Sequence, residues 1–361
     1  MPRRSAKKPR RGQRDLSLPY QEWRFEVGEP EAGERLDGFL STRLGWRSRT
    51  LVQRAIEEGA VQVLPFKDPQ QAEVGAMRPG LKLRRGQEVV VRFDAPGGDE
   101  ATRPPEASGL ADASELQIVF EDEHVLAINK PPGIAVHPSK GHLTGSLIHL
   151  IHERHRALHG DTRDVPTLCH RLDRETSGLI LCAKDQLSRT RLGKQFERRS
   201  VKKVYLALVV GEMAADEGVV DAPIGPALTG SVRLKMGVRE DGAGQPALTR
   251  WRVRERRSGR TLVELHPETG RQHQLRVHLA HLGHPIVGDK LYLGGDEIFA
   301  RSVEGQLTRA ELDRLGLDHH ALHSWRLTFE HPFTGFETTL EAPLWPTIAA
   351  LSGDAAAATG P

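Results

Sequence analysis

The 361-residue chain contains two cysteines, three tyrosines and no long apolar run. Cys169 and Cys182 form no series of paired cysteines, so a disulfide-stabilised scaffold is not expected. No stretch approaches the ~20 consecutive apolar residues of a membrane-spanning helix, and the N-terminus carries no apolar signal segment. These absences predict a reduced, soluble protein of the cytoplasm that makes no contact with a membrane.

Positive charge is concentrated at the N-terminus. Residues 1–14 hold seven Lys or Arg and no acid, although the whole chain has a net charge of only +3. The rest carries 44 basic against 48 acidic side chains, a net charge of −4. Binding to nucleic acid would therefore depend on local basic patches and on this arm. We expect residues 1–19 to be a disordered basic arm; the alternative is a tail that only aids solubility.

Residues 20–93 have the pattern of a small α/β domain, with strands expected at 60–64 and 88–93. The spacing of apolar residues predicts two amphipathic helices. The first buries Leu36, Phe39, Leu40 and Leu44. The second begins at Ser48, ends at Gly59 and buries Leu51, Val52, Ala55 and Ile56. Four arginines are expected to lie exposed beside these helices: Arg43, Arg47, Arg49 and Arg54.

This segment resembles the S-four-like RNA-binding domain, a small module found in a ribosomal protein and in several RNA enzymes. The matching stretches are Arg35 to Asp37, Ser48 to Arg54 and Glu58 to Val63. The resemblance implies that the four arginines contact RNA. The alternative is an ordinary helical hairpin whose arginines are only solvated.

Composition divides the rest of the chain into three parts. Residues 94–115 are rich in Ala, Pro, Gly and acid, which predicts an extended linker. Residues 116–347 are expected to form the catalytic domain, and residues 348–361 a disordered tail. The domain's expected strands are 116–120, 125–129, 179–183, 204–210, 248–254, 261–266 and 321–329, and its expected helices are 145–158, 186–199 and 271–282. Because strands outnumber helices and often follow one another, we predict an α+β fold with a largely antiparallel mixed sheet flanked by helices.

The first of three polar segments runs from His170 to Gly178 and precedes an apolar strand. Asp173 lies between Arg171 and Arg174, whose charges would keep its carboxylate ionised, as a nucleophile or general base requires. The alternative is an aspartate that only caps the turn from Thr176 to Gly178. The residues alone leave both interpretations open.

The second polar segment is 202–211, where Tyr205 is the only aromatic residue and follows Lys202 and Lys203. A tyrosine can stack on a nucleobase and hydrogen-bond to its edge, although a core tyrosine is the alternative. The third segment, 266–278, enters a helix. Its apolar stripe leaves His273 and Arg276 together on another face, where they can reach an anion.

Histidines are dense after this point, which raises the question of a metal site. The cysteines are distant in sequence, and Asp289 is the only acid among the histidines. Helix histidines with satisfied hydrogen bonds explain the spacing equally well, so no metal is expected. The histidines concerned are His273, His278, His281 and His284.

The combination of segments resembles the RluA, RluC and RluD group of pseudouridine synthases. The resemblance covers about 116–330 and rests on ordered motifs. These are His170 to Asp173, Thr176 to Gly178, Lys203 to Tyr205, Thr269 to Arg276 and Gly283 to Asp289, with Phe120 to Gly133 and Val136 to Pro138 before them. It implies the pseudouridine synthase fold, and the upstream module implies large-subunit (23S) ribosomal RNA as substrate.

The resemblance also implies residue roles. Asp173 would start glycosidic bond cleavage, Tyr205 would stack on the uracil and assist proton removal from carbon 5, and Arg276 would pair with the aspartate. Arg171 would help to fill the gap left by the flipped nucleotide. Further RNA contacts are expected from His170, Arg174, Thr176, Lys203, Arg271 and His273.

Uridine and pseudouridine are isomers, so the reaction requires no metal and no redox cofactor. Nothing in the sequence indicates an extended interface, and we expect a monomer. Three alternatives stay open: a uridine of transfer RNA as substrate, a non-catalytic RNA-binding or ribosome-assembly protein, and a hydrolase in which Asp173 and a histidine activate water.

Overall fold

The computed structural model describes residues 20–43, 49–64, 77–94, 113–137, 146–160 and 165–352. The chain forms two compact units, Met1–Arg103 and Pro104–Pro361. The expected basic arm and nearly all of the expected linker lie outside the described residues. Among the helices of the described ranges, none has the length and apolar character needed to cross a membrane.

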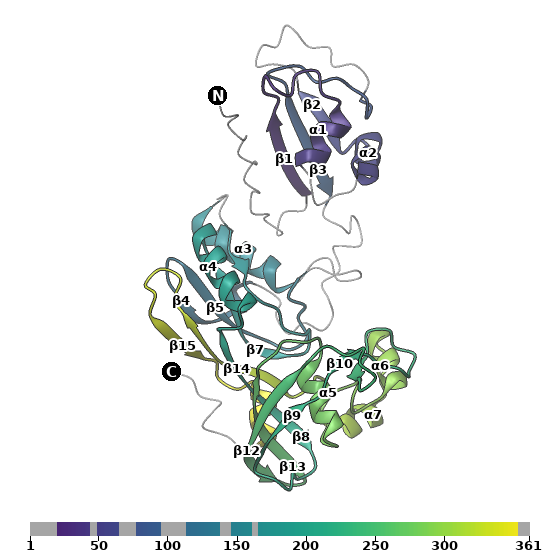
Figure 1. Ribbon diagram of the computed structural model, residues 1–361, viewed down its shortest axis with the longest axis vertical. Helices are drawn as coiled ribbons and strands as arrows, with labels where there is room; N and C mark the ends of the chain where they lie inside the picture. Colours follow the sequence, from purple (N-terminus) through teal and green to yellow (C-terminus); the bar gives the residue numbers. More distant parts are fainter. Residues whose placement is uncertain are drawn as a thin grey trace. The chain divides into compact units, whose positions relative to one another are not determined.

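The N-terminal unit contains a three-stranded antiparallel sheet in the order β1-β3-β2 (Figure 1). Both predicted helices and both predicted strands are present, and the first strand was not predicted. The core of the N-terminal unit is formed by apolar residues such as Leu36, Phe39, Ile56 and Val89. The elements are β1 (Tyr20–Glu26), α1 (Leu36–Arg43), α2 (Arg49–Glu57), β2 (Val61–Leu64) and β3 (Glu88–Asp94).

The arginines of this unit differ from their expected state. The Arg43 side chain is only 16% exposed, pairs with Glu31 at 2.8 Å and lies 3.7 Å from the centre of the Phe39 ring. Arg54 is exposed but pairs with Glu58 one helical turn later, at 2.6 Å. Arg47 and the Arg49 side chain lie outside the described residues. The expectation of an exposed Arg43 was therefore wrong, because the Glu31 carboxylate and the Phe39 ring both contact its guanidinium and cover it.

The C-terminal unit is built on a ten-stranded sheet in the order β4-β5-β7-β14-β8-β13-β12-β9, with β15 on β14 and β6 on β7. All pairs are antiparallel except β7 with β14. The predicted α+β class with a largely antiparallel sheet is confirmed. The strands are β4 (Gln117–Glu121), β5 (Val125–Lys130), β6 (Thr167–Leu168), β7 (Ser177–Ala183), β8 (Lys202–Val210), β9 (Glu217–Asp221), β12 (Leu248–Arg257), β13 (Arg260–Pro267), β14 (Leu322–Glu330) and β15 (Glu337–Glu341).

Helices and a two-stranded ribbon surround this sheet, and the three predicted helices correspond to α3, α4 and α5. Helix α8 corrects the predicted tail, because its Ile348 and Ala349 are buried in the core and the packed structure continues to Ser352. The additional elements are η3 (Ala113–Glu115), α3 (Leu147–His159), α4 (Gln186–Glu197), β10 (Ile224–Pro226), β11 (Met236–Val238), α5 (Gln274–His281), α6 (Asp296–Val303), α7 (Arg309–Leu315) and α8 (Pro346–Ser352).

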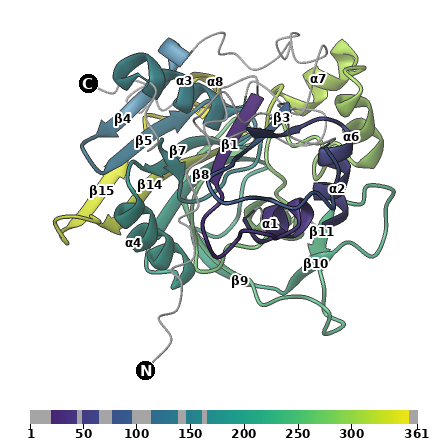
Figure 2. The same ribbon diagram turned by 90° about the horizontal axis from the view of Figure 1, so that it is seen from above.

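Strand β7 is buried along its whole length because helices cover both of its faces. On one face Ile180 packs in a cluster with Leu147 of α3, and on the other Leu181 packs in a cluster with Leu192 of α4. Figure 2 shows β5 and β7 between these two helices. A strand buried on both sides needs a continuous apolar run, which explains the sequence Leu179-Ile-Leu-Cys-Ala183.

Gly178 allows β7 to approach β14 closely. Its φ of +105° is unfavourable for a residue with a β-carbon, and an added β-carbon would lie 2.3 Å from the Ser324 carbonyl oxygen. The pairing of β7 with β14 consists of His323 with Ser177 and Ser324 with Gly178. This glycine therefore fixes the end of the loop that carries Asp173.

We expect Gly178→Ala to destabilise the C-terminal unit by roughly 2 kcal/mol or more, through strain and overpacking. Gly193→Ala is the matched control, because an added β-carbon there would have no neighbour within 4 Å. In the middle of α4, that control should stabilise the protein by about 0.5–1 kcal/mol. Urea unfolding of both variants measures the difference, and equal free energies of unfolding would contradict the role of Gly178.

Candidate active site

The three polar segments meet at one pocket of about 430 Å³. The loop before β7, strand β8 and the segment that enters α5 form its walls. Nine of the ten residues predicted to act in this domain line it, and Arg174 does not. The nine are His170, Arg171, Asp173, Thr176, Lys203, Tyr205, Arg271, His273 and Arg276.

Asp173 presents its carboxylate to this pocket. The side chain is 27% exposed, and its Oδ2 accepts a hydrogen bond from Nη1 of Arg276 at 3.1 Å. Burial alone would raise the pKa of Asp173, but the neighbouring groups together outweigh this effect, Arg276 first among them through its charge and its hydrogen bond, and the pKa lies below its ordinary value. The pocket therefore offers an ionised carboxylate within reach of a ligand.

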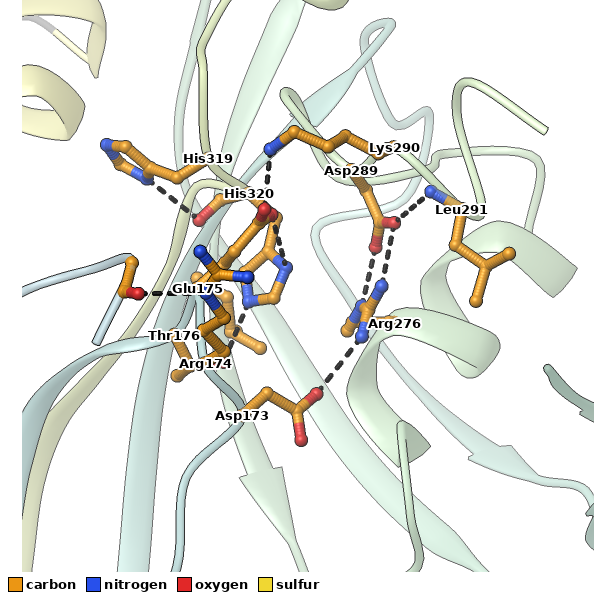
Figure 3. A network of polar contacts seen from close by, with 12 residues as sticks. Asp173, Arg174, Glu175, Thr176, Arg276, Asp289, Lys290, Leu291, His319 and His320 are labelled. Atoms are coloured by element: carbon orange, nitrogen blue, oxygen red, sulfur yellow. Dashed lines mark hydrogen bonds and ion pairs between the residues drawn. The ribbon is translucent and has the colours of Figure 1, made fainter. Parts of the chain in front are cut away.

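Arg276 is held from its other side by Asp289, as Figure 3 shows. Its Nε and Nη2 donate to the two oxygens of Asp289 at 2.7 and 2.9 Å. Asp289 is fully buried and also accepts hydrogen bonds from the backbone N–H groups of Leu291 and Tyr292. Burial would raise the pKa of Asp289, but Arg276 and these donors lower it to about 2. Two of the three guanidinium nitrogens are thus committed to Asp289, and the third faces Asp173.

Tyr205 and Lys203 reach the pocket from β8, where residues two apart share a face. Burial raises the pKa of Tyr205 to about 12, so its phenol is uncharged at neutral pH. Burial lowers the pKa of Lys203, and the neighbouring charge of Arg199 lowers it further. The strand therefore supplies an aromatic wall with a cation two residues away.

Two histidines of the pocket are uncharged at neutral pH. Burial is the main cause, lowering the pKa of His170 to about 3 and that of His273 to about 4. His170 stacks on Phe196 with ring centres 4.7 Å apart, and its Nε2 accepts a hydrogen bond from the Leu181 N–H. His273 has a φ of 56° just before α5, and its Nδ1 lies 3.0 Å from the Tyr292 hydroxyl. Both rings are held by the fold.

Buried polar groups support the loop that carries Asp173. The Thr176 hydroxyl hydrogen-bonds to Nε2 of His320 at 2.7 Å, and Lys290 pairs with Glu175 at 2.6 Å (Figure 3). Lys130 is fully buried and donates to the backbone carbonyls of Pro131, Ile134 and Arg174. Burial lowers the pKa of Lys130 to about 7. These contacts fix the backbone that directly follows Asp173.

The remaining predicted residues fall into two groups. Arg171 is exposed at the pocket and is accessible from solvent. Arg174 instead donates from Nε to the Gly133 carbonyl at 2.9 Å, and Arg271 donates to the Pro246 carbonyl at 3.0 Å while still lining the pocket. The sequence prediction gave Arg174 a substrate role, whereas its described contact holds the loop in place.

The sequence analysis gave no role to Asp289, Lys130 and His320, although a signal is present for the first two. Asp289 follows the apolar run Pro285-Ile-Val287, and Lys130 ends the apolar strand β5. A charged group next to residues of this kind becomes buried and needs a partner. The partner's identity depends on the tertiary structure and could not be read from the sequence.

The lining residues give the pocket a clear electrostatic character. They include four Lys or Arg and one acid, Asp173. Within the described residues, no group of three or more His, Cys, Asp or Glu could hold a metal ion. The site can therefore bind a polyanion, accept an aromatic group against Tyr205 and apply one carboxylate to it.

Comparisons with known proteins point to one family. A family model for RNA pseudouridylate synthase matches residues 124–281. The chain is 37% identical over 330 residues to "Ribosomal large subunit pseudouridine synthase C" of Pasteurella multocida, which covers 91% of this chain and 92% of the relative. It is 35% identical over 325 residues to "Ribosomal large subunit pseudouridine synthase D" of Pseudomonas aeruginosa, which covers 89% of this chain and 90% of the relative.

A solved structure agrees with these sequence matches. The human protein "RNA Pseudouridylate Synthase Domain Containing 4" superimposes with a TM-score of 0.50 and 29% identity, covering 64% of this chain and 90% of the human chain. The fold, the ordered motifs and the sequence similarity over nearly the whole chain all point to the same family. The chain belongs to the RluA, RluC and RluD group of RNA pseudouridine synthases and is an enzyme of that kind.

Proposed function

We propose that this enzyme isomerises specific uridines of large-subunit ribosomal RNA, with Asp173 as its catalytic carboxylate. The names of the relatives from Pasteurella multocida and Pseudomonas aeruginosa support this substrate. The observation that carries the assignment of Asp173 is its ion pair with Arg276 at 3.1 Å, in a pocket that Tyr205 also lines.

The reaction exchanges one glycosidic bond for another. The bond between N1 of uracil and C1′ of ribose breaks, the base turns, and a bond between C5 and C1′ forms. The proton lost from C5 is balanced by one gained at the freed N1, so no oxidant, reductant or water is consumed. The pocket must therefore hold a detached uracil and exclude water while the base turns.

Asp173 can begin this sequence in one of two ways. Its carboxylate can attack C1′ of the ribose, or it can take the proton from C2′ as N1 departs. Both routes require an ionised carboxylate, and Arg276 keeps the pKa of Asp173 low. Asp289 accepts two further hydrogen bonds from Arg276 and keeps the guanidinium in position beside Asp173.

Tyr205 provides the wall on which the flipped uracil stacks. Its pKa of about 12 keeps the hydroxyl protonated, so the phenol can hydrogen-bond to the edge of the base without bringing a second negative charge next to Asp173. A neutral phenol cannot accept the C5 proton, so Tyr205 assists this step by hydrogen-bonding to the base, and the Asp173 carboxylate accepts the proton. Arg171, exposed at the pocket, is placed to enter the space that the flipped nucleotide leaves in the RNA.

The N-terminal unit and the basic arm extend the RNA contact in this proposal. The unit resembles the S-four-like domain in its motifs, and the arm can attract phosphates without a fixed structure. Because the described Arg43 and Arg54 are paired with acids, we assign less of the RNA affinity to these two arginines than to the arm. We expect a monomer in the cytoplasm, where ribosomal RNA is the substrate.

Asp173→Asn should lower the single-turnover rate of pseudouridine formation by at least about a thousandfold, because the amide can neither attack nor accept a proton. RNA affinity should stay within a few-fold of the parent, since no phosphate-binding group is removed. Asp313→Asn, on the exposed surface of α7, is the control and should keep full activity. Equal conversion by Asp173→Asn and the parent would refute the catalytic role.

The pH dependence should separate catalysis from stability. With pKa values of about 3 to 4, His170, His273 and His320 stay neutral, so the single-turnover rate should be constant from pH ~6.5 down to ~5, where an ordinary histidine would gain its proton. The unfolded chain, with histidine pKa values of ~6.5, takes up those protons first. The free energy of unfolding should therefore fall over the same interval.

Quenched-flow assays of pseudouridine formation and thermal unfolding at each pH measure the two quantities. A rate that declines with an apparent pKa near that of free histidine, while the unfolding temperature stays constant, would contradict the neutral state of these side chains.

A further inference from the structure

Helix α4 and the turn after it carry an unusual amount of positive charge. Residues 186–203 contain seven Lys or Arg and a single acid, Glu197, although the chain beyond residue 14 has a net charge of −4. The basic residues are Arg189, Arg191, Lys194, Arg198, Arg199, Lys202 and Lys203. A local excess of this size attracts an anion, provided that the charges are not already neutralised.

Most of these charges are not neutralised within the described residues. Arg191 donates to the Pro332 carbonyl, and Lys202 pairs with Glu337 at 3.1 Å. The other exposed cations form no ion pair with a described residue, and Glu197 forms none either. The unpaired cations are Arg189, Lys194, Arg198 and Arg199. These exposed cations are therefore available to an anion from outside the chain, which would also reduce the repulsion between them.

Two of the unpaired arginines, Arg189 and Arg199, come from the segment that carries the pocket residue Phe196. Phe196, Cys169 and Lys203 all line the catalytic pocket. Arg189 precedes Phe196 by seven residues, about two helical turns, which places both on one face of α4. Burial lowers the pKa of Lys203, and the charge of Arg199 lowers it further. The two arginines therefore flank Phe196 along the chain, seven residues before it and three residues after it.

The backbone at Arg199 provides independent evidence. Its φ is 58°, a left-handed conformation that glycine adopts without strain, and its N–H bonds to the Phe196 carbonyl at 3.2 Å to end the helix. Helices α3 and α7 end with glycines at this point, Gly160 and Gly316. A cation near the end of a helix is favourable, but Lys194 and Arg198 already supply that charge. An arginine at this strained position is therefore not explained by the needs of the helix.

We propose that Arg189 and Arg199 bind phosphates of the RNA on either side of the flipped uridine. This inference rests on the proposed function and specifies where the substrate's backbone lies, along the Phe196 side of the pocket. Phosphates there would neutralise the unpaired cations and relieve the repulsion between Arg199 and Lys203. Both arginines act in binding, and neither touches the reacting atoms.

Arg199→Gly gives the sharpest test, because it should affect stability and binding in opposite directions. Glycine removes the strain at φ 58°, so the thermal unfolding midpoint should stay the same or rise. The Kd for transcribed large-subunit ribosomal RNA should increase on the order of tenfold, and the plot of log K against log salt should become shallower by about 1. If the role of Arg199 were only structural, the variant would not combine an unchanged or higher unfolding midpoint with a weaker Kd for RNA.

The double variant Arg189→Gln, Arg199→Gly should make the salt plot shallower by about 2. Arg257→Gln, Arg314→Gln is the matched control, because it removes the same charge from exposed sites on β12 and α7 that do not line the pocket. The control should leave Kd and salt slope nearly unchanged.

The outcomes distinguish this inference from the proposed function. If the full-length parent forms pseudouridine while the double variant keeps the parental Kd and salt slope, the phosphate contact is wrong and the proposed function stands. An equal loss in the control also overturns it, because the effect would then be one of total charge. A parent that binds RNA through these arginines and forms no pseudouridine would instead contradict the proposed function alone.

Discussion

The catalytic pocket depends on a single guanidinium that is shared between two carboxylates of unequal exposure. Asp289 is fully buried and holds Arg276 through two hydrogen bonds, while Asp173 takes the third from the side of the pocket. A planar guanidinium is suited to this task because its donors point in fixed directions. Removing either buried partner would leave a charge without compensation, which costs several kcal/mol. Asp289, which does not line the pocket, thus anchors the ion pair between Arg276 and Asp173.

Much of this arrangement could be predicted from the sequence. Asp173, Tyr205 and Arg276 come from segments far apart in the chain, and the motifs that contain them predicted that all three share one site. The α+β fold followed from the excess of strands. The apolar run at 179–183 predicted a buried strand, since such runs are typical of strands that are covered on both faces.

What the sequence could not reveal has physical reasons. Strand β15 has the burial pattern of an edge strand, with exposed polar residues at Glu337 and Glu341, so it lacks the apolar signal that identified β7. Helix α7 depends on a capping box between Thr308 and Glu311 more than on an apolar stripe. The paired state of Arg43 and the anchoring role of Asp289 both depend on partners that the fold brings together. Charged residues can be located from sequence, but their partners cannot.

The parallel contact between β7 and β14 has a mechanical consequence. It consists of two residue pairs, and it joins the strands β4, β5 and β7 to the rest of the sheet. Asp173 precedes β7, whereas Arg276 follows β13 on the other side of this seam. Separation of β7 from β14 would lengthen the ion pair between Asp173 and Arg276, and the ion pair in turn holds the two strands together. The Asp173–Arg276 ion pair therefore spans the contact between β7 and β14, and it supports the continuity of the sheet as well as the geometry of the pocket.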